Sequence, residues 1–390
     1  MKIVIINNLF KPYNIGGAEK IVELQATAWS SAHDVTIITT SPFKGISSLK
    51  LSADETETYA YKILRFFPLN LYHYLDGHDF FWFARLIWNF FDVFNLHSYL
   101  VIRQKLAEIK PDMVVFHNLK GIGYLLGLLS RKYRCVMILH DVQYAIPSGL
   151  LLKSEETKNS ELNGLYCDIN RHLFSGVQKV IAPSQWLLNF YRDKGLFSLA
   201  KTYKVPNPIT GHGSFSGSRT LHQPLKLLFV GQIEDHKGLD WASNNLGSEI
   251  ELDIVGSGSQ LQNLRDKYPS KPSIRFHGRL DNPNLTQFYQ QADYLLVPSR
   301  CYENYPTVIL EAFAHGLPVI GVSHGGVPEL VEEEKTGFLF ESGVGDSLVK
   351  AVQKARSWAD YESLRTACHQ RVQPQSAENY EKTLLRIALE

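Results

Sequence analysis

The chain has 390 residues, of which 44% are hydrophobic and 20% are charged, and its formal net charge at pH 7 is +1. One ordinary hydrophobic core does not extend over this length, so the sequence predicts two domains of about 200 residues each. The composition is typical of a soluble globular protein. The balanced charge gives no support to a nucleic-acid partner, whose phosphates call for a basic excess.

The first ten residues, MKIVIINNLF, hold one lysine and a short apolar run, with no small-residue cleavage site after them. This pattern predicts a buried strand rather than a signal peptide. No uncharged apolar run reaches the roughly 18 residues that a membrane-spanning helix needs. The cysteines, Cys135, Cys167, Cys301 and Cys368, are too widely spaced for a metal knuckle or a CxxC pair, which predicts reduced thiols and a cytoplasmic location.

Ten short apolar runs along the chain are predicted strands, and segments with helical periodicity separate them. Runs this rich in Val and Ile are typical of parallel strands buried on both faces. Because they fall into two sets of five, we expect an α/β protein with two Rossmann-like, doubly wound sheets. The runs are 2–8, 34–40, 112–118, 135–141 and 179–184, then 225–231, 251–258, 274–278, 294–299 and 318–323.

The expected domain boundary lies in residues 205–226, which are rich in Pro, Gly and Ser and have no periodicity. We predict an N-terminal domain over residues 1–205 and a C-terminal domain over 206–376. A helix over 377–390 follows and could pack back on the N-terminal domain. Ligands of doubly wound sheets bind at the carboxyl ends of the strands, so two such domains facing each other would form a cleft with two half-sites.

Residues 66–99 hold 13 aromatic side chains, including FFWF at 80–83 and WNFF at 88–91. One interpretation is a set of helices that pack on the first domain. The other is an exposed apolar face that contacts a membrane surface or a lipid-linked substrate. Arg65, Arg85 and Arg103 would suit an anionic surface, although such cations are sparse here.

Two glycine-containing loops follow predicted strands. The first, N-I-G-G-A-E at 14–19, opens a predicted helix, where Gly16 and Gly17 leave room for a ligand to approach the backbone. The second, V-G-Q-I-E-D-H-K-G at 230–238, places Lys237 where it could neutralise phosphate charge. Each loop also has a plainer interpretation, a tight turn in the first and a solvated lysine in the second.

The stretch E-N-Y-P-T-V-I-L-E places Glu303 and Glu311 eight positions apart around Pro306. Proline favours the first position of a helix and glycine ends one, so a helix is predicted from about Pro306 to Ala314, before Gly316. Free N–H groups at a helix N-terminus bind anions. A phosphate there would have a carboxylate on each side, as suits a nucleotide sugar. The alternative is an ordinary helix with an acidic first turn.

In this order the motifs resemble the retaining glycosyltransferases of family 4, which have the GT-B fold. The resemblance covers nearly the whole chain, is most specific over 298–331 and is weak over 42–110. The matching motifs are GGAE at 16–19, Lys237-Gly238, IVGSG at 254–258, FHG at 276–278, PS at 298–299, E-x7-E at 303–311, E-A-x-A-x-G-x-P-V-I at 311–320 and GGVPELV at 325–331.

The resemblance implies a role for each matching position. Lys237 would bind the donor's diphosphate, Glu303 the transferred sugar and Glu311 the ribose, while His140 would contact the donor sugar near the reacting carbon. The implied catalytic residues are Lys237, Glu303 and His140. The implied donor-binding residues are Gly16, Gly17, Gln232, Lys237, Gly256, Arg279, Ser299, Glu303, Asn304, Tyr305, Pro306, Thr307 and Glu311.

Two further residues, His117 and Asp141, are expected on the acceptor side, although His117 could equally be a satisfied strand-end residue. The sequence departs from the family at Gln232, where an arginine is usual. Glutamine brings no positive charge, so stabilisation of the leaving group would depend on Lys237 and the helix N-terminus. This departure keeps open a degenerate protein that binds a sugar nucleotide or glycan without turnover.

No two aspartates are two positions apart, so the Asp-x-Asp metal motif of the other main transferase fold is missing from the sequence. We therefore expect no metal or other cofactor, and charge stabilisation by Lys237 and backbone N–H groups. The family implies a retaining hexosyltransferase, with front-face attack in which the leaving phosphate oxygen takes the acceptor's proton. UDP-glucose or another UDP-hexose is the expected donor, and GDP-mannose the alternative.

Other enzyme classes explain less of the sequence. A glycoside hydrolase would use paired carboxylates but needs neither the glycine pair nor Lys237. A dinucleotide-dependent oxidoreductase would use G-I-G-Y-L-L-G at 121–127 with Asp141, but the spacing is GxGxxxG. A sugar-nucleotide epimerase with the same fold also stays open. The acceptor is expected to be a glycan or a lipid-linked sugar in polysaccharide or glycoconjugate synthesis, with contact at the inner face of the cytoplasmic membrane through residues 66–99.

Overall fold

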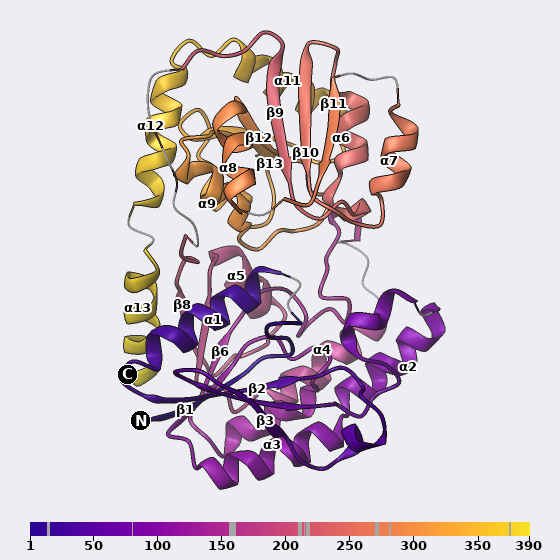
Figure 1. Ribbon diagram of the computed structural model, residues 1–390, viewed down its shortest axis with the longest axis vertical. Coiled ribbons are helices and arrows are strands. Elements are labelled where there is room, and N and C mark those ends of the chain that lie inside the picture. The colour runs from indigo at the N-terminus through magenta and orange to yellow at the C-terminus, as the bar shows by residue number, and fades with distance from the viewer. Residues whose placement is uncertain are drawn as a thin grey trace. The chain divides into compact units, whose positions relative to one another are not determined.

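In a computed structural model the chain divides into two units (Figure 1). The first unit comprises Met1–Leu150, Asn159–Pro206 and Glu378–Glu390, and the second comprises Leu151–Lys158 and Asn207–Ala377. The structure describes residues 1–13, 16–79, 81–155, 161–209, 213, 215, 219–269, 273–280, 282–373 and 376–390.

The described residues of the first unit form a sheet with strand order β3-β4-β2-β1-β5-β6-β7-β8. Strand β3 is antiparallel to β4, and the other neighbouring strands are parallel. Residues Ile3 to Ile6 of β1 are fully buried, as an apolar strand covered on both faces must be. The strands are β1 (Lys2–Ile6), β2 (Asp34–Thr40), β3 (Asp54–Thr58), β4 (Lys62–Phe66), β5 (Met113–Phe116), β6 (Cys135–Ile138), β7 (Lys179–Ala182) and β8 (Lys201–Lys204).

Helices cover this sheet. Helix α1 packs on β2, α5 packs on β7 and β8, and α2, α3 and α4 pack against the 3-10 helix η3. The helices are α1 (Gly17–Trp29), α2 (Trp82–Val93), α3 (Leu96–Ile109), α4 (Glu161–Leu173), α5 (Gln185–Asp193) and α13 (Ala377–Leu389), with 3-10 helices η1 (Ile46–Leu49), η2 (Tyr74–Asp79) and η3 (Tyr124–Arg131).

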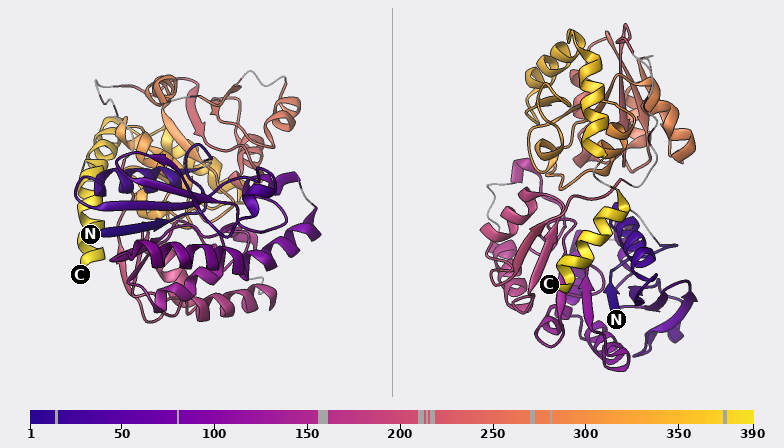
Figure 2. Two further views of the ribbon diagram at one scale, coloured as in Figure 1. Left: turned by 60° about the horizontal axis from the view of Figure 1, so that its bottom comes forward. Right: turned by 90° about the vertical axis from the view of Figure 1, so that its left-hand side faces the viewer.

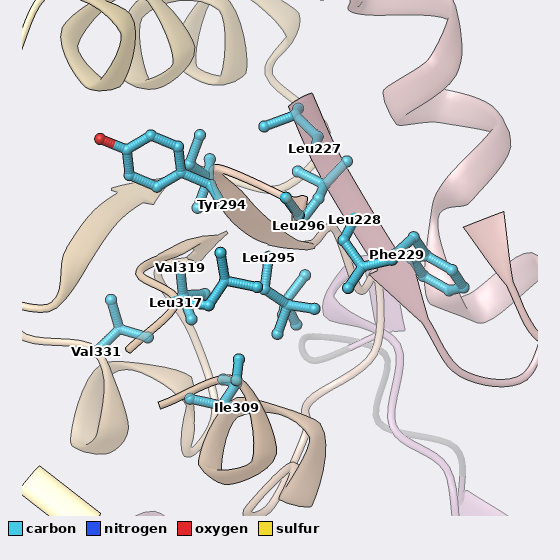
Figure 3. Close-up of a cluster of buried hydrophobic side chains, with 14 of the residues drawn as sticks. Leu227, Leu228, Phe229, Tyr294, Leu295, Leu296, Ile309, Leu317, Val319 and Val331 are labelled. Carbon is cyan, nitrogen blue, oxygen red and sulfur yellow. The ribbon is translucent and has the colours of Figure 1, made fainter. Parts of the chain in front are cut away.

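The second unit contains a parallel sheet with strand order β11-β10-β9-β12-β13-β14. Its core joins β9, β12 and β13 to α9 through side chains such as Leu228, Leu295 and Ile309 (Figure 3). The elements are η4 (Lys153–Glu155), β9 (Leu225–Val230), η5 (Asp235–Lys237), α6 (Leu239–Asn245), β10 (Ile250–Val255), α7 (Leu261–Lys267), β11 (Ile274–Gly278), α8 (Asn282–Gln291), β12 (Tyr294–Val297), α9 (Thr307–Ala314), β13 (Val319–Val322), α10 (Val327–Leu330), β14 (Gly337–Phe340), α11 (Gly345–Arg356) and α12 (Tyr361–Val372).

All ten predicted strands are confirmed, and the α/β class with two Rossmann-like sheets is confirmed with them. Strands β3, β4, β8 and β14 were not predicted. The sequences DETET of β3 and KTYK of β8 are polar because each lies at an edge of the sheet, where one side of the strand is open to water. Strands β4 (KILRF) and β14 (GFLF) are apolar and largely buried, so polarity explains only the failure to predict β3 and β8.

Two short segments show how the chain is shared between the units. Helix α13 packs on the first unit (Figure 2). Its Leu384 belongs to the same core cluster as Ile3, and Lys179 Nζ donates a hydrogen bond to the carbonyl of Ile387 at 2.7 Å. Residues Leu151–Lys158, which the prediction placed in the first domain, group with the second unit. Backbone pairing holds them there, since Lys153 N donates to the carbonyl of Arg300 at 2.9 Å.

Each sheet has a switch point, where strand order reverses along the chain. It lies between β1 and β5 in the first unit and between β9 and β12 in the second. Loops that leave the carboxyl ends of these paired strands diverge and leave room for a ligand. We therefore expect binding sites in the loops that follow these strands. The loops begin at Asn7 and His117 in the first unit and at Gly231 and Pro298 in the second.

The aromatic segment has one buried and one exposed face. Trp88 and Val93 of α2 are buried, whereas Phe81, Phe83 and Phe90 are 85%, 60% and 61% exposed. Helix α2 therefore packs on the first unit with one face and exposes aromatic side chains on the other, while Arg65, expected at an anionic surface, is buried. Phe80 of the FFWF run lies outside the described residues. Within the described chain, no helix combines the length and apolar character needed to cross a membrane.

Candidate functional site

The loops after β9 and β12 bring a lysine and a glutamate together at the switch point of the second unit. Lys237 Nζ donates to Glu303 Oε1 at 2.7 Å, and Ser299 Oγ donates to the same oxygen at 2.6 Å. Burial by itself would raise the pKa of Glu303, but Lys237 and Ser299 outweigh it and hold that pKa below its ordinary value. Burial would lower the pKa of Lys237, and Glu303 raises it above its ordinary value. Both groups are therefore charged at neutral pH.

Glycines let these loops approach each other. Gly238 has φ +71°, and a Cβ there would lie 2.1 Å from the carbonyl oxygen of Pro298. A Cβ at Gly326 would lie 1.6 Å from the carbonyl oxygen of Asn304, and the Gly326 N–H donates to the carbonyl of Glu303 at 2.7 Å. The glycines of the HKG and GGVPEL motifs thus hold the lysine loop and the glutamate loop in place.

Helix α9 begins where the sequence indicated. Pro306 is its N-cap and Gly316 follows its end with φ +64°, which confirms the predicted bounds to within one residue. Glu311 lies inside the helix, and its Oε2 accepts from the hydroxyl of Tyr289 at 2.9 Å. Tyr289 in turn stacks on His315, with ring centroids 5.2 Å apart. The carboxylate expected to bind ribose is therefore held by a neighbouring ring.

The other predicted donor residues of this unit have varied surroundings. Tyr305 is buried in the core cluster, and the side chains of Gln232 and Arg279 are exposed. Gly256 has φ +153°, and a Cβ there would lie 1.8 Å from the carbonyl oxygen of Gly231. This close approach gives Gly256 a packing role, because it allows the loop after β10 to lie on the loop after β9.

In the first unit, the glycine pair lies at the start of α1. Gly17 is the first residue of the helix, and the Gly16 N–H donates to Glu19 Oε2 at 2.9 Å, the reciprocal half of a capping box. A Cβ at Gly16 would meet only the Glu19 carboxylate, at 3.7 Å. A side chain at position 16 would therefore be in ordinary van der Waals contact with Glu19. Asn14 and Ile15 of the motif lie outside the described residues.

His117 follows β5 and His140 follows β6, and the structure brings the two rings together. His117 Nδ1 lies 2.9 Å from His140 Nε2, and the stacked rings have centroids 5.2 Å apart. His117 Nε2 lies 2.7 Å from Gln25 Oε1 of α1. Burial lowers the pKa of His140 to about 4 and that of His117 well below its ordinary value. Both imidazoles are therefore neutral at physiological pH.

The glycine-rich segment 121–127 and Asp141 do not form a dinucleotide site. Gly121 donates its N–H to both carboxylate oxygens of Asp92, and a Cβ at Gly127 would lie 3.0 Å from the backbone of Leu173. These glycines allow η3 to pack against α3 and α4. Burial raises the pKa of Asp141, whose Oδ1 accepts two hydrogen bonds from the next-but-one residue rather than facing this segment.

Sequence reasoning missed Gln25 and Tyr289, whose side chains hydrogen-bond to the predicted site residues His117 and Glu311. Gln25 carried a detectable signal, because it is a polar residue in the buried stripe of α1 that also contains Ile21, Val22 and Trp29. Tyr289 carried none, since aromatic residues are ordinary in helices that cover a sheet. Across the described ranges, no group of three or more His, Cys, Asp or Glu side chains could hold a metal ion.

Comparisons with known proteins cover both units. Residues 15–210 match the family described as Glycosyltransferase Family 4, and residues 224–357 match Glycosyl transferases group 1. An uncharacterized 42.6 kDa protein in the cps region of Klebsiella pneumoniae is 23% identical over 337 residues, which cover 85% of this chain and 87% of that protein. Glycogen synthase of Mycobacterium tuberculosis is 24% identical over 377 residues, covering 86% and 81%.

A similar solved structure is that of HepE from Anabaena in complex with UDP. It has a TM-score of 0.69 and 16% identity, and the alignment covers 99% of each chain. At this identity the likeness shows the fold, which is the GT-B fold of two Rossmann-like units.

Proposed function

The chain belongs to glycosyltransferase family 4, and from this premise we propose that it moves a hexose from a UDP-sugar, with UDP-glucose as first candidate, to a glycan or lipid-linked acceptor. The family identifies a glycosyltransferase. The nature of the donor, the stereochemistry and the acceptor are the proposal. Two relatives support its direction, since one is named glycogen synthase and HepE was solved with UDP bound.

The observation that carries the proposal is the contact of Lys237 with Glu303 beside the N-terminus of α9. A diphosphate placed there would meet the N-terminal N–H groups of α9 and the Lys237 ammonium. Glu303 would accept from sugar hydroxyls and Glu311 from ribose hydroxyls. The arrangement thus offers positive charge for phosphates between two acceptors for hydroxyl groups, in the order in which a nucleotide sugar carries them.

For the reaction, we propose retention of configuration by front-face attack. The bond between the anomeric carbon and the phosphate oxygen breaks, and the acceptor oxygen bonds to the same face of that carbon. The leaving phosphate oxygen takes the acceptor's proton. Lys237 and the N–H groups of α9 stabilise the charge that develops on the diphosphate, so no metal is required. Glu303 orients the sugar and forms no covalent adduct.

The exposed face of α2 supports an acceptor at a membrane surface. Between residues 81 and 107 the sequence has one acidic residue, Asp92, which is buried and accepts from Gly121. The cations Arg85 and Arg103 lie in the same range. Exposed aromatic rings beside cations, on a helix whose one acid is buried, suit an anionic lipid surface. We therefore propose a cytoplasmic enzyme that contacts the inner face of the membrane and builds polysaccharide or glycoconjugate.

The donor is tested by thermal unfolding with UDP-glucose, UDP-galactose, UDP-GlcNAc, GDP-mannose, ADP-glucose and NAD, each without metal and then with magnesium. A ligand at 100 times its Kd adds about 2.7 kcal/mol to the free energy of unfolding. We expect a metal-independent shift with a UDP-hexose that is lost in Glu311→Ala, and transfer that is lost in Glu303→Ala. A shift of the unfolding temperature with GDP-mannose alone would identify GDP-mannose as the donor instead of a UDP-hexose. Binding of a nucleotide sugar without transfer to any glycan would support a degenerate protein that binds without turnover.

The membrane contact is tested separately by sedimentation with vesicles of anionic phospholipid. Phe83→Glu and Phe90→Glu should each weaken binding, because each places a carboxylate in the apolar face. Leu199→Glu is the matched control, since Leu199 is also exposed on the first unit but lies outside the segment. Equal effects of the three variants, or no binding by the wild type, would refute the membrane contact.

A further inference from the structure

Three side chains from separate elements form a hydrogen-bonded chain inside the first unit. Gln25 comes from α1, His117 follows β5 and His140 follows β6. The distances are 2.7 Å from Gln25 Oε1 to His117 Nε2 and 2.9 Å from His117 Nδ1 to His140 Nε2. Gln25 and His117 are fully buried, so water does not compete for these hydrogen bonds.

The two imidazoles constrain each other. Both are neutral, and a neutral imidazole carries one N–H, on either Nδ1 or Nε2. One proton occupies the gap between His117 Nδ1 and His140 Nε2, and it belongs to one ring or the other. If His117 carries its proton on Nε2, its Nδ1 can only accept, and His140 must then carry its proton on Nε2. The tautomer of one ring therefore dictates that of the other.

The amide of Gln25 selects between these two states. With Oε1 towards His117, the amide accepts the His117 Nε2–H, and the protonation of both rings follows from that contact. Rotation of the amide by half a turn would present N–H donors instead and reverse both tautomers. The orientation of one side chain on α1 thus determines which nitrogen of His140 carries the lone pair.

The stability of α1 does not account for a glutamine here. Among the described residues, Gln25 Nε2 has no hydrogen-bond partner although it is buried. An unpaired buried amide is unfavourable, and the neighbours of Gln25 on the buried face include Ile21 and Val22. A leucine or methionine would suit this position better if packing were its purpose. Residues that lower stability in this way are expected where function requires them.

We infer that Gln25 is a positioning residue that acts through His117 to hold His140 in the Nε2–H tautomer, which makes His140 Nδ1 a hydrogen-bond acceptor for a substrate hydroxyl. The inference rests on the proposed function, in which His140 contacts the sugar. It deepens that proposal, because it states that His140 accepts from the sugar through Nδ1 rather than donates to it.

The test is ¹⁵N NMR of protein labelled at histidine, with the His140 signals assigned by their loss in His140→Asn. Wild type should show His140 with N–H at Nε2 and a lone pair at Nδ1. Gln25→Met, which keeps the length of the side chain, should give a mixture of His140 tautomers and about a tenfold lower kcat for transfer, with a smaller change in KM. His117→Phe removes the acceptor for His140 Nε2 and should give the same spectral change.

Ile21→Val is the control, because it trims the same buried face of α1 and removes no hydrogen-bonding group, and it should leave the His140 signals unchanged. The inference is overturned if wild-type His140 carries its proton on Nδ1, or if Gln25→Met leaves the tautomer as in wild type. A changed tautomer with unchanged kcat would overturn the functional part. The spectra need no substrate, so they stay informative even if the proposed reaction is wrong. Should Gln25→Met fail to fold, wild type and His117→Phe decide the question.

Discussion

Replacing Glu303 by glutamine should destabilise the second unit although the side chain keeps its shape. The side chains of Lys237 and Glu303 are only 24% and 15% exposed, so water replaces little of the lost contact. In Glu303→Gln the ammonium of Lys237 keeps an amide oxygen as partner but loses its countercharge. Ser299 also loses the anionic end of a strong hydrogen bond.

The magnitude follows from the burial of the pair. Removing one partner of a fully buried ion pair costs about 3–5 kcal/mol. Partial exposure and the remaining amide oxygen reduce this cost, so we expect about 2 kcal/mol at pH 7. For a domain of 150–250 residues, 1 kcal/mol corresponds to roughly 2–4 °C in Tm, so the transition of this unit should fall by about 4–8 °C.

The pH dependence has a definite sign. The pKa of Glu303 is lower in the folded protein than its ordinary value of 4.5, so its stabilisation is complete above pH 4.5 and is lost as pH falls through the folded pKa. The pKa of Lys237 is raised, so its stabilisation is complete below 10.5 and is lost as pH rises through the folded pKa. In Glu303→Gln, the free energy of unfolding should lose the part of its decrease at acid pH that comes from this pair. The part that comes from other carboxylates should remain.

A double-mutant cycle with Lys237→Met measures the pair directly by urea unfolding. The matched control is Lys267 with Asp240 in the same unit, whose distance is also 2.7 Å but whose side chains are each 46% exposed. An exposed pair of this kind contributes about 0–1 kcal/mol. We expect a coupling energy of roughly 2 kcal/mol for the first pair. A coupling no larger than that of Lys267 with Asp240 would refute the argument from burial.

Three further outcomes follow from the structure. Gly256→Ala should destabilise the protein by about 3 kcal/mol or more in urea unfolding, because its Cβ would lie 1.8 Å from the Gly231 carbonyl oxygen at φ +153°; an unchanged midpoint would show that the loops separate freely. Burial raises the pKa of Glu381 to about 8, so folding keeps its proton while the unfolded chain ionises above pH 4.5. Stability should fall as pH rises between these values, and Glu381→Leu should gain roughly 2–3 kcal/mol more at pH 7 than at pH 4, whereas an equal gain at both would contradict this. Tyr289→Phe removes the hydroxyl that donates to Glu311 and should raise the Kd for UDP-sugar about fivefold in calorimetry. An unaltered Kd would show that Tyr289 does not contribute to donor binding.

The strand runs, the start of α9 and the glycines at turns were readable because each is a local signal. Val- and Ile-rich runs identify buried strands wherever they lie, and a proline before an apolar helix marks the beginning of that helix within a few residues. The same signals failed for β3 and β8 because edge strands are polar. The linker-like composition of residues 205–226 gave no sign that residues 151–158 group with the second unit, since the pairing of Lys153 with Arg300 spans almost 150 positions.

The sequence by itself determined that this protein has two Rossmann-like sheets. It also indicated that Lys237 and Glu303 lie in loops after strands and that Glu311 lies in the helix that follows Glu303. It also carried the resemblance to its family. Only the tertiary structure decided which of these residues meet. Lys237 reaches Glu303 across 66 positions and Gln25 reaches His117 across 92. Such contacts depend on strand order and on the close approach of loops, and neither leaves a mark on neighbouring residues that periodicity could detect.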